Sequence, residues 1–262
     1  MKKYLIDLRV TRRILLEENY LILHLTDPEK PLPDMRPGQF VEVLVENSPS
    51  TFLRRPISIN YVDRERNEMW LLVHMIGEGT RAMGRLEPGD TLNCLMPLGN
   101  TFSIADEGVQ KYKSPLLVGG GVGTAPMLFL GTALAEKGIR PAFLLGGRSR
   151  NFLLQLDDFK RIGDLYTTTE DGSHGERGYV TGHSILSERE FDYIATCGPK
   201  PMMVAVAAHA RKAGISCEVS LENLMACGLG ACLCCVEKTV RGNVCVCTEG
   251  PVFNTNQLTW HN

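Results

Sequence analysis

The chain has 262 residues, of which 44% are hydrophobic and 22% charged, proportions typical of a soluble globular protein with room for two domains and a small appendage. A formal net charge of −2 gives no reason to expect nucleic acid or an anionic membrane as a partner. Charges interrupt the N-terminal segment by Asp7 and no apolar run approaches 18 residues, so we expect neither a signal peptide nor a membrane-spanning helix. Together with the nine cysteines, this predicts a protein of the reducing cytoplasm.

The first hundred residues consist of short stretches rich in Val, Ile and Leu, separated by turns with Pro, Gly, Asn or Asp. Six such stretches with frequent turns predict a small antiparallel β-barrel, interrupted by one helix at 79–86. The predicted strands are 4–10, 20–26, 39–45, 57–61, 69–75 and 91–96.

Two segments of the predicted barrel have the chemistry of a phosphate-binding site. In Arg55-Pro56-Ile57-Ser58, a guanidinium on a strand can bind a pyrophosphate, and Ser58 offers a hydroxyl and an N–H to a flavin. An ordinary edge strand with surface arginines is the alternative. Gly77-Glu78-Gly79-Thr80 opens the predicted helix and offers free N–H groups to a phosphate, although a plain turn with Thr80 as N-cap fits as well. His74 precedes this segment, either as a packed residue or beside a flavin.

From about residue 114 strands alternate with helices, which predicts a doubly wound parallel sheet. A buried strand at 115–118 runs into Gly119-Gly120-Gly121-Val122-Gly123-Thr124-Ala125-Pro126, and a helix at 127–137 follows. These glycines would let a pyrophosphate approach the main chain, and the helix N-terminus would attract its charge. A tight turn without a ligand is the alternative. Further predicted elements are strands at 141–145, 165–168 and 193–197 and a helix at 200–213.

The residues after the second strand of this sheet leave the choice between NADH and NADPH open. No acidic residue clearly ends that strand, and Arg148 and Arg150 stand there instead. An arginine at this place could favour a 2′-phosphate.

Six of the nine cysteines lie between residues 227 and 247. The spacing Cys227-x4-Cys232-x2-Cys235, followed by a distant cysteine, is that of plant-type [2Fe–2S] ligation. Structural zinc sites more often use two separated C-x2-C pairs, and disulfides fit a reducing compartment poorly. A group of inert buried cysteines is the third alternative. The spacing therefore favours an iron–sulfur cluster.

The rest of the cysteine segment supports a tight wrap around a cluster. Gly228 and Gly230 lack the side chains that would keep backbone N–H groups away from the cluster sulfides. Cys245 and Cys247 would share a face of an extended segment, so either could be the fourth ligand. Cys234 is best explained as a small residue packed beside the cluster.

The order of these segments resembles that of the ferredoxin–NADP reductase superfamily. In that family an Arg-x-x-Ser strand holds the flavin, a Gly-rich loop ending in Pro holds the nicotinamide dinucleotide, and a Cys-Gly-Pro segment places a cysteine near the nicotinamide. The FAD-binding residues implied by the resemblance are Arg55, Pro56, Ile57, Ser58, Leu72, Val73, His74, Gly79 and Thr80. The NAD-binding residues implied by it are Gly119, Gly120, Gly121, Val122, Gly123, Thr124, Cys197, Gly198 and Pro199.

The C-terminal segment narrows the resemblance. Residues 222–232 and the ending Cys247-Thr248-Glu249-Gly250-Pro251-Val252-Phe253 resemble the electron-transfer subunits of two-subunit, NAD-linked (type B) dihydroorotate dehydrogenases, and the resemblance covers essentially the whole chain. It implies an FAD-binding β-barrel domain at 1–101, an NAD-binding α/β domain at 102–218 and a [2Fe–2S] domain at 219–262. The cluster ligands implied by it are Cys227, Cys232, Cys235 and Cys247, with Cys245 as a spare.

The resemblance also implies a function. Electrons would pass from the FMN of a catalytic subunit, which oxidises dihydroorotate in pyrimidine synthesis, through the cluster and FAD to NAD+, in an α2β2 heterotetramer. Such a relay needs no acid–base triad, so Cys197 beside the nicotinamide is the one candidate near the chemistry. The cluster should lie near the partner, where Leu229, Leu233, Val252 and Phe253 would form the surface or merely shield the cluster.

Two other functions stay open on the residues. The chain could be a flavin and iron–sulfur subunit of a ferredoxin-linked oxidoreductase or of a sulfide dehydrogenase. It could also be a redox-sensing regulator without catalytic activity. The Gly250-Pro251-Val252-Phe253 ending favours the dihydroorotate system.

Overall fold

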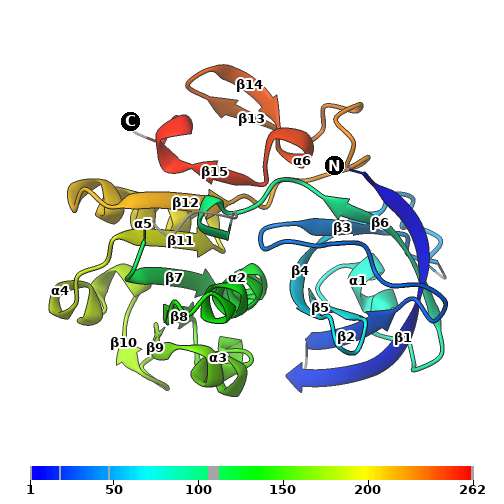
Figure 1. Ribbon diagram of the computed structural model, residues 1–262, viewed down its shortest axis with the longest axis horizontal. Coiled ribbons are helices and arrows are strands. Elements are labelled where there is room, and N and C mark those ends of the chain that lie inside the picture. Colours follow the sequence, from blue (N-terminus) through cyan, green and yellow to red (C-terminus); the bar gives the residue numbers. More distant parts are fainter. Residues whose placement is uncertain (1, 18, 47, 106–111, 261–262) are drawn as a thin grey trace.

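The computed structural model describes residues 2–17, 19–46, 48–105 and 112–260. Residues 106–111, which belong to the predicted 102–218 domain, lie outside the described residues. A barrel formed by the N-terminal part of the chain stands beside a sheet with helices on its faces, and the C-terminal segment lies across the top of both in Figure 1.

The N-terminal part forms a closed barrel with strand order β1-β2-β5-β4-β3-β6, in which neighbouring strands are antiparallel. This confirms the predicted six-stranded barrel. Strand β1 is longer than predicted because its first part pairs with β6 and its second part with β2. The barrel elements are β1 (Tyr4–Glu17), β2 (Tyr20–Thr26), β3 (Phe40–Val43), β4 (Arg55–Asp63), β5 (Glu68–His74), α1 (Glu78–Met83) and β6 (Thr91–Leu98).

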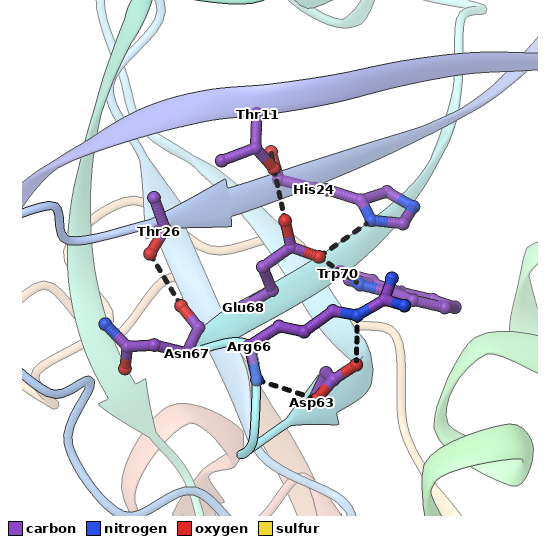
Figure 2. A network of polar contacts seen from close by, with 8 residues as sticks. All are labelled: Thr11, His24, Thr26, Asp63, Arg66, Asn67, Glu68 and Trp70. Atoms are coloured by element: carbon purple, nitrogen blue, oxygen red, sulfur yellow. Dashed lines mark hydrogen bonds and ion pairs between the residues drawn. The ribbon is translucent and has the colours of Figure 1, made fainter.

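Side chains alternate between the barrel interior and its outer face, as the strand geometry requires. In β5, Leu71 and Val73 point into the apolar interior, whereas Trp70, Leu72 and His74 lie on the outer face. The outer face also carries a polar network, shown in Figure 2, in which Glu68 accepts hydrogen bonds from side chains of β1, β2 and its own strand. Its partners and distances are Thr11 Oγ1 at 2.7 Å, His24 Nδ1 at 3.2 Å and Trp70 Nε1 at 3.4 Å.

The second part forms a sheet with order β10-β9-β8-β7-β11-β12-β15. The strands from β10 to β12 are parallel, which confirms the doubly wound prediction. The chain winds from β7 toward β8 on one side and returns to β11 on the other, so the switch point lies between β7 and β11. The elements are β7 (Pro115–Gly120), α2 (Thr124–Glu136), β8 (Ala142–Gly147), α3 (Leu156–Ile162), β9 (Asp164–Thr169), β10 (Glu176–Arg177), α4 (Ile185–Glu188), β11 (Tyr193–Cys197), α5 (Lys200–Lys212) and β12 (Ser216–Ser220).

The C-terminal segment combines a hairpin of β13 (Val236–Thr239) and β14 (Gly242–Cys245) with α6 (Val246–Glu249) and β15 (Val252–Asn254). Strand β15 pairs antiparallel with β12 and extends the large sheet. The boundary predicted between residues 218 and 219 falls inside β12. The three-domain division itself stays a prediction.

The parts of the molecule are fixed to one another by two sets of polar contacts, one around the buried Asn60 and one around the half-buried Asn100. Asn60 of the barrel and Gln155 of the sheet exchange amide hydrogen bonds of 3.1 Å, and Asn60 also donates to the Ala125 carbonyl. Asn100, after β6, donates to the carbonyls of Glu249 and Val252 and accepts from the Val252 N–H at 2.9 Å. The barrel is therefore bonded to both of the other segments. None of the helices in the described residues has the length and apolar character needed to span a membrane.

Candidate functional site

The two segments of the barrel predicted to bind phosphate meet in the structure. Arg55 begins β4, and Gly79 lies in the first turn of α1. A Cβ atom on Gly79 would lie 2.9 Å from Thr51 Cγ2 and 3.2 Å from Arg55 Nε, so the helix start and the guanidinium are in contact. This arrangement places a cation beside the N–H groups of a helix start, which suits an anionic group of a cofactor.

Thr80 is not the N-cap of α1, as the plain-turn alternative would require. Helix α1 begins at Glu78, and Gly77 is its N-cap residue. The Thr80 hydroxyl both accepts from the Gly77 N–H and donates to the Gly77 carbonyl, each at 3.1 Å. Thr80 therefore closes the first turn from inside the helix.

The three residues predicted on β5 face in two directions. Leu72 and His74 lie on the outer face, where the His74 ring stacks on Tyr20 with centroids 4.2 Å apart. Burial lowers the pKa of His74, which favours the neutral imidazole. Val73 points into the barrel and is fully buried, so only its main chain is available to a ligand on the outer face.

The predicted dinucleotide segments also meet, because β7 and β11 are neighbours with Gly119 opposite Cys197. Gly119 and Gly120 end β7, residues 121–123 form a single turn, and α2 begins at Thr124. A Cβ atom on Gly123 would lie 2.4 Å from the Cys197 carbonyl oxygen, so only glycine fits there.

The second loop packs equally closely on the first. Gly198 has a φ of +150°, and a Cβ atom on it would lie 3.1 Å from both the N and the O of Gly120. A Cβ atom on Gly120 would lie 3.2 Å from Pro199 Cδ. The two loops therefore form one glycine-lined surface at the switch point, where sheets of this kind bind dinucleotides.

Arg148 and Arg150, which leave the choice between NADH and NADPH open, follow the end of β8 and differ in their contacts. Both are exposed, but the Arg150 guanidinium donates to the Leu153 carbonyl at 2.9 Å, whereas Arg148 lies near Tyr20. Arg148 is therefore the better placed of the two to meet a cofactor phosphate.

Cys197 lies fully buried at the carboxyl end of β11. Burial raises the pKa of its thiol well above the usual range, and the nearby Glu222 carboxylate adds to this effect. The thiol donates to Glu222 Oε1 at 3.7 Å, a distance suited to a sulfur donor. Cys197 is thus a neutral thiol rather than a nucleophile, and Glu222 is a partner for which we had predicted no role.

The C-terminal segment brings five of its six cysteines together. Cys227 and Cys232 interact through their side chains, and the thiols of Cys245 and Cys247 both contact that of Cys235. Figure 1 shows this segment packed over the barrel near β3 and β6.

Backbone N–H groups point at three of these sulfur atoms. Leu229 donates to Cys227 Sγ at 3.3 Å, and this bond is the main reason that the pKa of Cys227 falls to about 6. Gly230 donates to Cys247 Sγ at 3.2 Å. The N–H of Cys247 donates to Cys235 Sγ at 3.4 Å. Such donors stabilise thiolates and the sulfides of a cluster alike.

The glycines of the loop are required by its backbone. Gly228 and Gly230 have φ angles of +64° and +81°, a region that favours glycine. A Cβ atom on Gly228 would lie 2.8 Å from Glu42 Cγ, so the loop lies directly on the barrel wall.

The spare cysteines differ from each other. Cys234 is exposed and outside the group of five, whereas Cys245 is inside it. The expected extended segment ends at Cys245, because Cys247 belongs to helix α6. Cys247 is also the more deeply buried of the two.

The donor set fits a two-iron cluster, since each iron takes two thiolates and three of the four predicted ligands receive backbone N–H bonds. No group of three His, Cys, Asp or Glu side chains around a single metal-ion position is found in the described part of the chain.

Apolar side chains surround the cysteine loop at the surface. Leu229 and Leu233 are 47% and 63% exposed, and Leu224 is 84% exposed. The expectation that Val252 and Phe253 form part of this surface was wrong. Both are buried, because β15 joins the sheet and turns them into the core.

The comparisons with known proteins agree with these features. Residues 222–259 match the model of the iron-sulfur cluster binding domain of dihydroorotate dehydrogenase B. The electron transfer subunit of dihydroorotate dehydrogenase B (NAD(+)) from Bacillus caldolyticus is 34% identical over 252 residues, which are 95% of each chain. That from Lysinibacillus sphaericus is 37% identical over 88% of this chain and 90% of its own.

Among solved structures, the NADH-dependent reduced ferredoxin–NADP oxidoreductase superposes with a TM-score of 0.84 and 28% identity, over 97% of this chain and 90% of the other. The flavohem-like FAD/NAD binding domain of a Vibrio cholerae nitric oxide dioxygenase shares the fold, with a TM-score of 0.68 and 17% identity over 81% of this chain and 97% of its own. By its near full-length identity to the curated relatives, this chain belongs to the family of dihydroorotate dehydrogenase B electron transfer subunits.

Proposed function

We propose that this chain carries electrons from the FMN of a dihydroorotate dehydrogenase catalytic subunit through a [2Fe–2S] cluster and FAD to NAD+, in pyrimidine synthesis. The observation that carries the proposal is the group of cysteines with backbone N–H donors, packed on the wall of the barrel whose strand β4 bears Arg55 and Ser58. It supports a cluster and a flavin as neighbours in one electron path.

When bound, FAD would exchange two electrons with the nicotinamide and the cluster would carry them singly. Arg55 and the start of α1 would hold the FAD phosphates. The loops after β7 and β11 would hold NAD, with the neutral Cys197 thiol beside the nicotinamide. The cluster would be bound by Cys227, Cys232, Cys235 and Cys247.

The partner would dock where the cluster lies. The exposed Leu224, Leu229 and Leu233 around the cysteine loop support this, because an apolar surface beside a redox centre suits a protein interface. We further propose an α2β2 heterotetramer in the cytoplasm, where nine free cysteines would stay reduced. Size-exclusion chromatography with mass measurement of the co-expressed subunits tests the assembly, and separate elution would contradict it.

The experiment that tests the function uses this chain co-expressed with an FMN-containing dihydroorotate dehydrogenase catalytic subunit. We expect dihydroorotate to drive NADH formation by the complex, and two irons and two acid-labile sulfides per copy of this chain. The catalytic subunit alone should form no NADH. NADH formation that is independent of this chain, or zinc without sulfide, would contradict the proposal.

A ferredoxin-linked oxidoreductase is the competing function, because such a protein superposes closely on this chain. The higher identity to the dihydroorotate dehydrogenase subunits favours our proposal. Ferredoxin reduction by NADH at a rate above that of dihydroorotate-driven NADH formation would reverse this preference. If the chain were instead a regulator without catalytic activity, addition of NADH would leave its bound flavin oxidised.

A further inference from the structure

Glu42 is a charged residue in an otherwise apolar strand. In β3, Val41 and Val43 point into the barrel interior, whereas Phe40 and Glu42 point outward to the C-terminal segment. The outward face of a barrel strand usually meets water, but here the cysteine loop covers it. Glu42 is consequently 0% exposed.

The carboxylate of Glu42 lies directly under the cysteine loop. A Cβ atom on Gly228 would be 2.8 Å from Glu42 Cγ and 3.3 Å from its Oε1. On the barrel, Glu42 is opposite Pro56 of the predicted flavin strand. Glu42 therefore lies between the two segments to which we assign the FAD and the cluster.

No side chain of the described residues neutralises this carboxylate by a hydrogen bond or an ion pair, because both of its oxygens are buried without a partner. Arg54 is the cation with the largest effect on Glu42, but its guanidinium donates to the backbone carbonyls of Glu42 and Asn93 and to the Asn93 side chain. The other charged groups that face Glu42 are Arg55 and Cys227. Burial raises the pKa of Glu42 to about 7.

A buried charge acts strongly on its neighbours, because the low local dielectric and the absence of counterions weaken its screening. Net charge around a cluster is one of the factors that set its reduction potential. A carboxylate beside the cluster opposes the addition of an electron, whereas a neutral side chain of the same shape does not.

We propose that Glu42 is a tuning residue, whose ionised carboxylate holds the reduction potential of the cluster low. This inference rests on the proposed function, since it needs a cluster at the cysteine loop. Glu42 would act through space on the cluster and would make no bond to iron.

The test is a potentiometric titration followed by electron paramagnetic resonance on the whole chain with its bound cluster. Measured well above the pKa of Glu42, the Glu42→Gln variant should show a higher cluster potential than the wild type. Glu42→Asp, which keeps a carboxylate, should stay near the wild type. The matched control is Glu65→Gln, which makes the same change of charge at an exposed position in the β4–β5 turn and should leave the potential unchanged.

A second measurement needs no variant. The wild-type potential should fall as the pH rises through the pKa of Glu42, and this dependence should vanish in Glu42→Gln, which a purely structural role would not produce. Equal potentials of wild type and Glu42→Gln at high pH, or a wild-type potential independent of pH, would overturn the inference. Iron and sulfide content is measured first, because a wild-type chain without a cluster would contradict the proposed function instead.

Discussion

The loops after β7 and β11 and the cysteine loop are both rich in glycine, but they use it differently. At Gly123 a Cβ atom would meet the main chain of Cys197 at 2.4 Å, so the glycine lets two neighbouring strands of the sheet continue into touching loops. At Gly228 and Gly230 the backbone is left-handed, and the nearest neighbours of a Cβ atom would be side chains, Glu42 Cγ at 2.8 Å and Thr248 Cγ2 at 2.9 Å.

This difference indicates which of the two sites can form without its ligand. The dinucleotide loops are held by strand pairing and close packing that need no ligand. The cysteine loop is held by N–H···S bonds, whereas its thiols repel one another when ionised. Part of its order should therefore come from the metal. Substitutions in the first region should strain the fold, whereas those in the second should cost a cofactor.

The largest effect should follow replacement of a ligand in the cysteine loop. Cys247→Ser removes the buried thiol that receives the Gly230 N–H bond, and we expect the cluster to be lost. Reduction of the bound flavin by NADH should persist, because the dinucleotide loops are untouched. Iron and sulfide analysis with stopped-flow absorbance checks both, with the exposed Cys234→Ser as control. A full cluster in Cys247→Ser would show that Cys245 is the ligand.

The opposite result should follow a change in the dinucleotide loops. Gly123→Ala forces the Cys197 backbone to move, at a cost of about 3 kcal/mol in the free energy of unfolding. The KM for NADH should rise, and the iron content should stay the same. Gly182→Ala, where a Cβ atom would meet no neighbour, is the control in urea unfolding. If Gly123→Ala left both the stability and the KM unchanged, close packing of the two dinucleotide loops would not explain the glycine.

The joint between the barrel and the cysteine segment should give a smaller effect. Asn100→Ala leaves the N–H and carbonyl of Val252 and the carbonyl of Glu249 without their side-chain partner, which should cost about 2 kcal/mol. Cluster loss on dilution should also become faster than in the wild type. Asn243→Ala, at an exposed hairpin position, should change neither quantity. Equal behaviour of the two variants would refute the role of Asn100 as a clamp.

The smallest effect should come from the network in Figure 2, which is separate from both regions. Burial lowers the pKa of His24 from its ordinary 6.5, although the bond to Glu68 opposes this shift. The unfolded chain therefore binds a proton at His24 more readily than the folded one, and stability should fall as the pH falls below about 6.5. His24→Gln should flatten this dependence in urea unfolding, and an unchanged slope would contradict the assignment.

The sequence allowed the barrel and the parallel sheet to be predicted because their strands carry long local patterns. The predicted strand at 193–197 coincides with β11, and the Gly119–Gly123 turn lies where expected. The C-terminal elements were not predicted, since β15 has three residues and exists only by pairing with the distant β12. Their form depends on tertiary contacts that no local pattern contains.

The same reason explains which site residues were missed. Glu222 has a role only because the fold brings it to Cys197, 25 residues earlier in the chain. Glu42 carried a signal, because a carboxylate between Val41 and Val43 breaks an apolar strand, but its burial depends on the loop around Gly228. Val252 and Phe253 could not be assigned to core or surface before their strand had a partner.

The most direct test of the account measures dihydroorotate-driven NADH formation by the complex of the catalytic subunit with either the wild-type chain or Cys247→Ser. We expect the wild-type complex to form NADH and the Cys247→Ser complex, once shown to lack the cluster, to form none, while both oxidise NADH with an artificial electron acceptor at the flavin. Equal dihydroorotate-driven rates for the two complexes would contradict the claim that electrons pass through the cysteine segment.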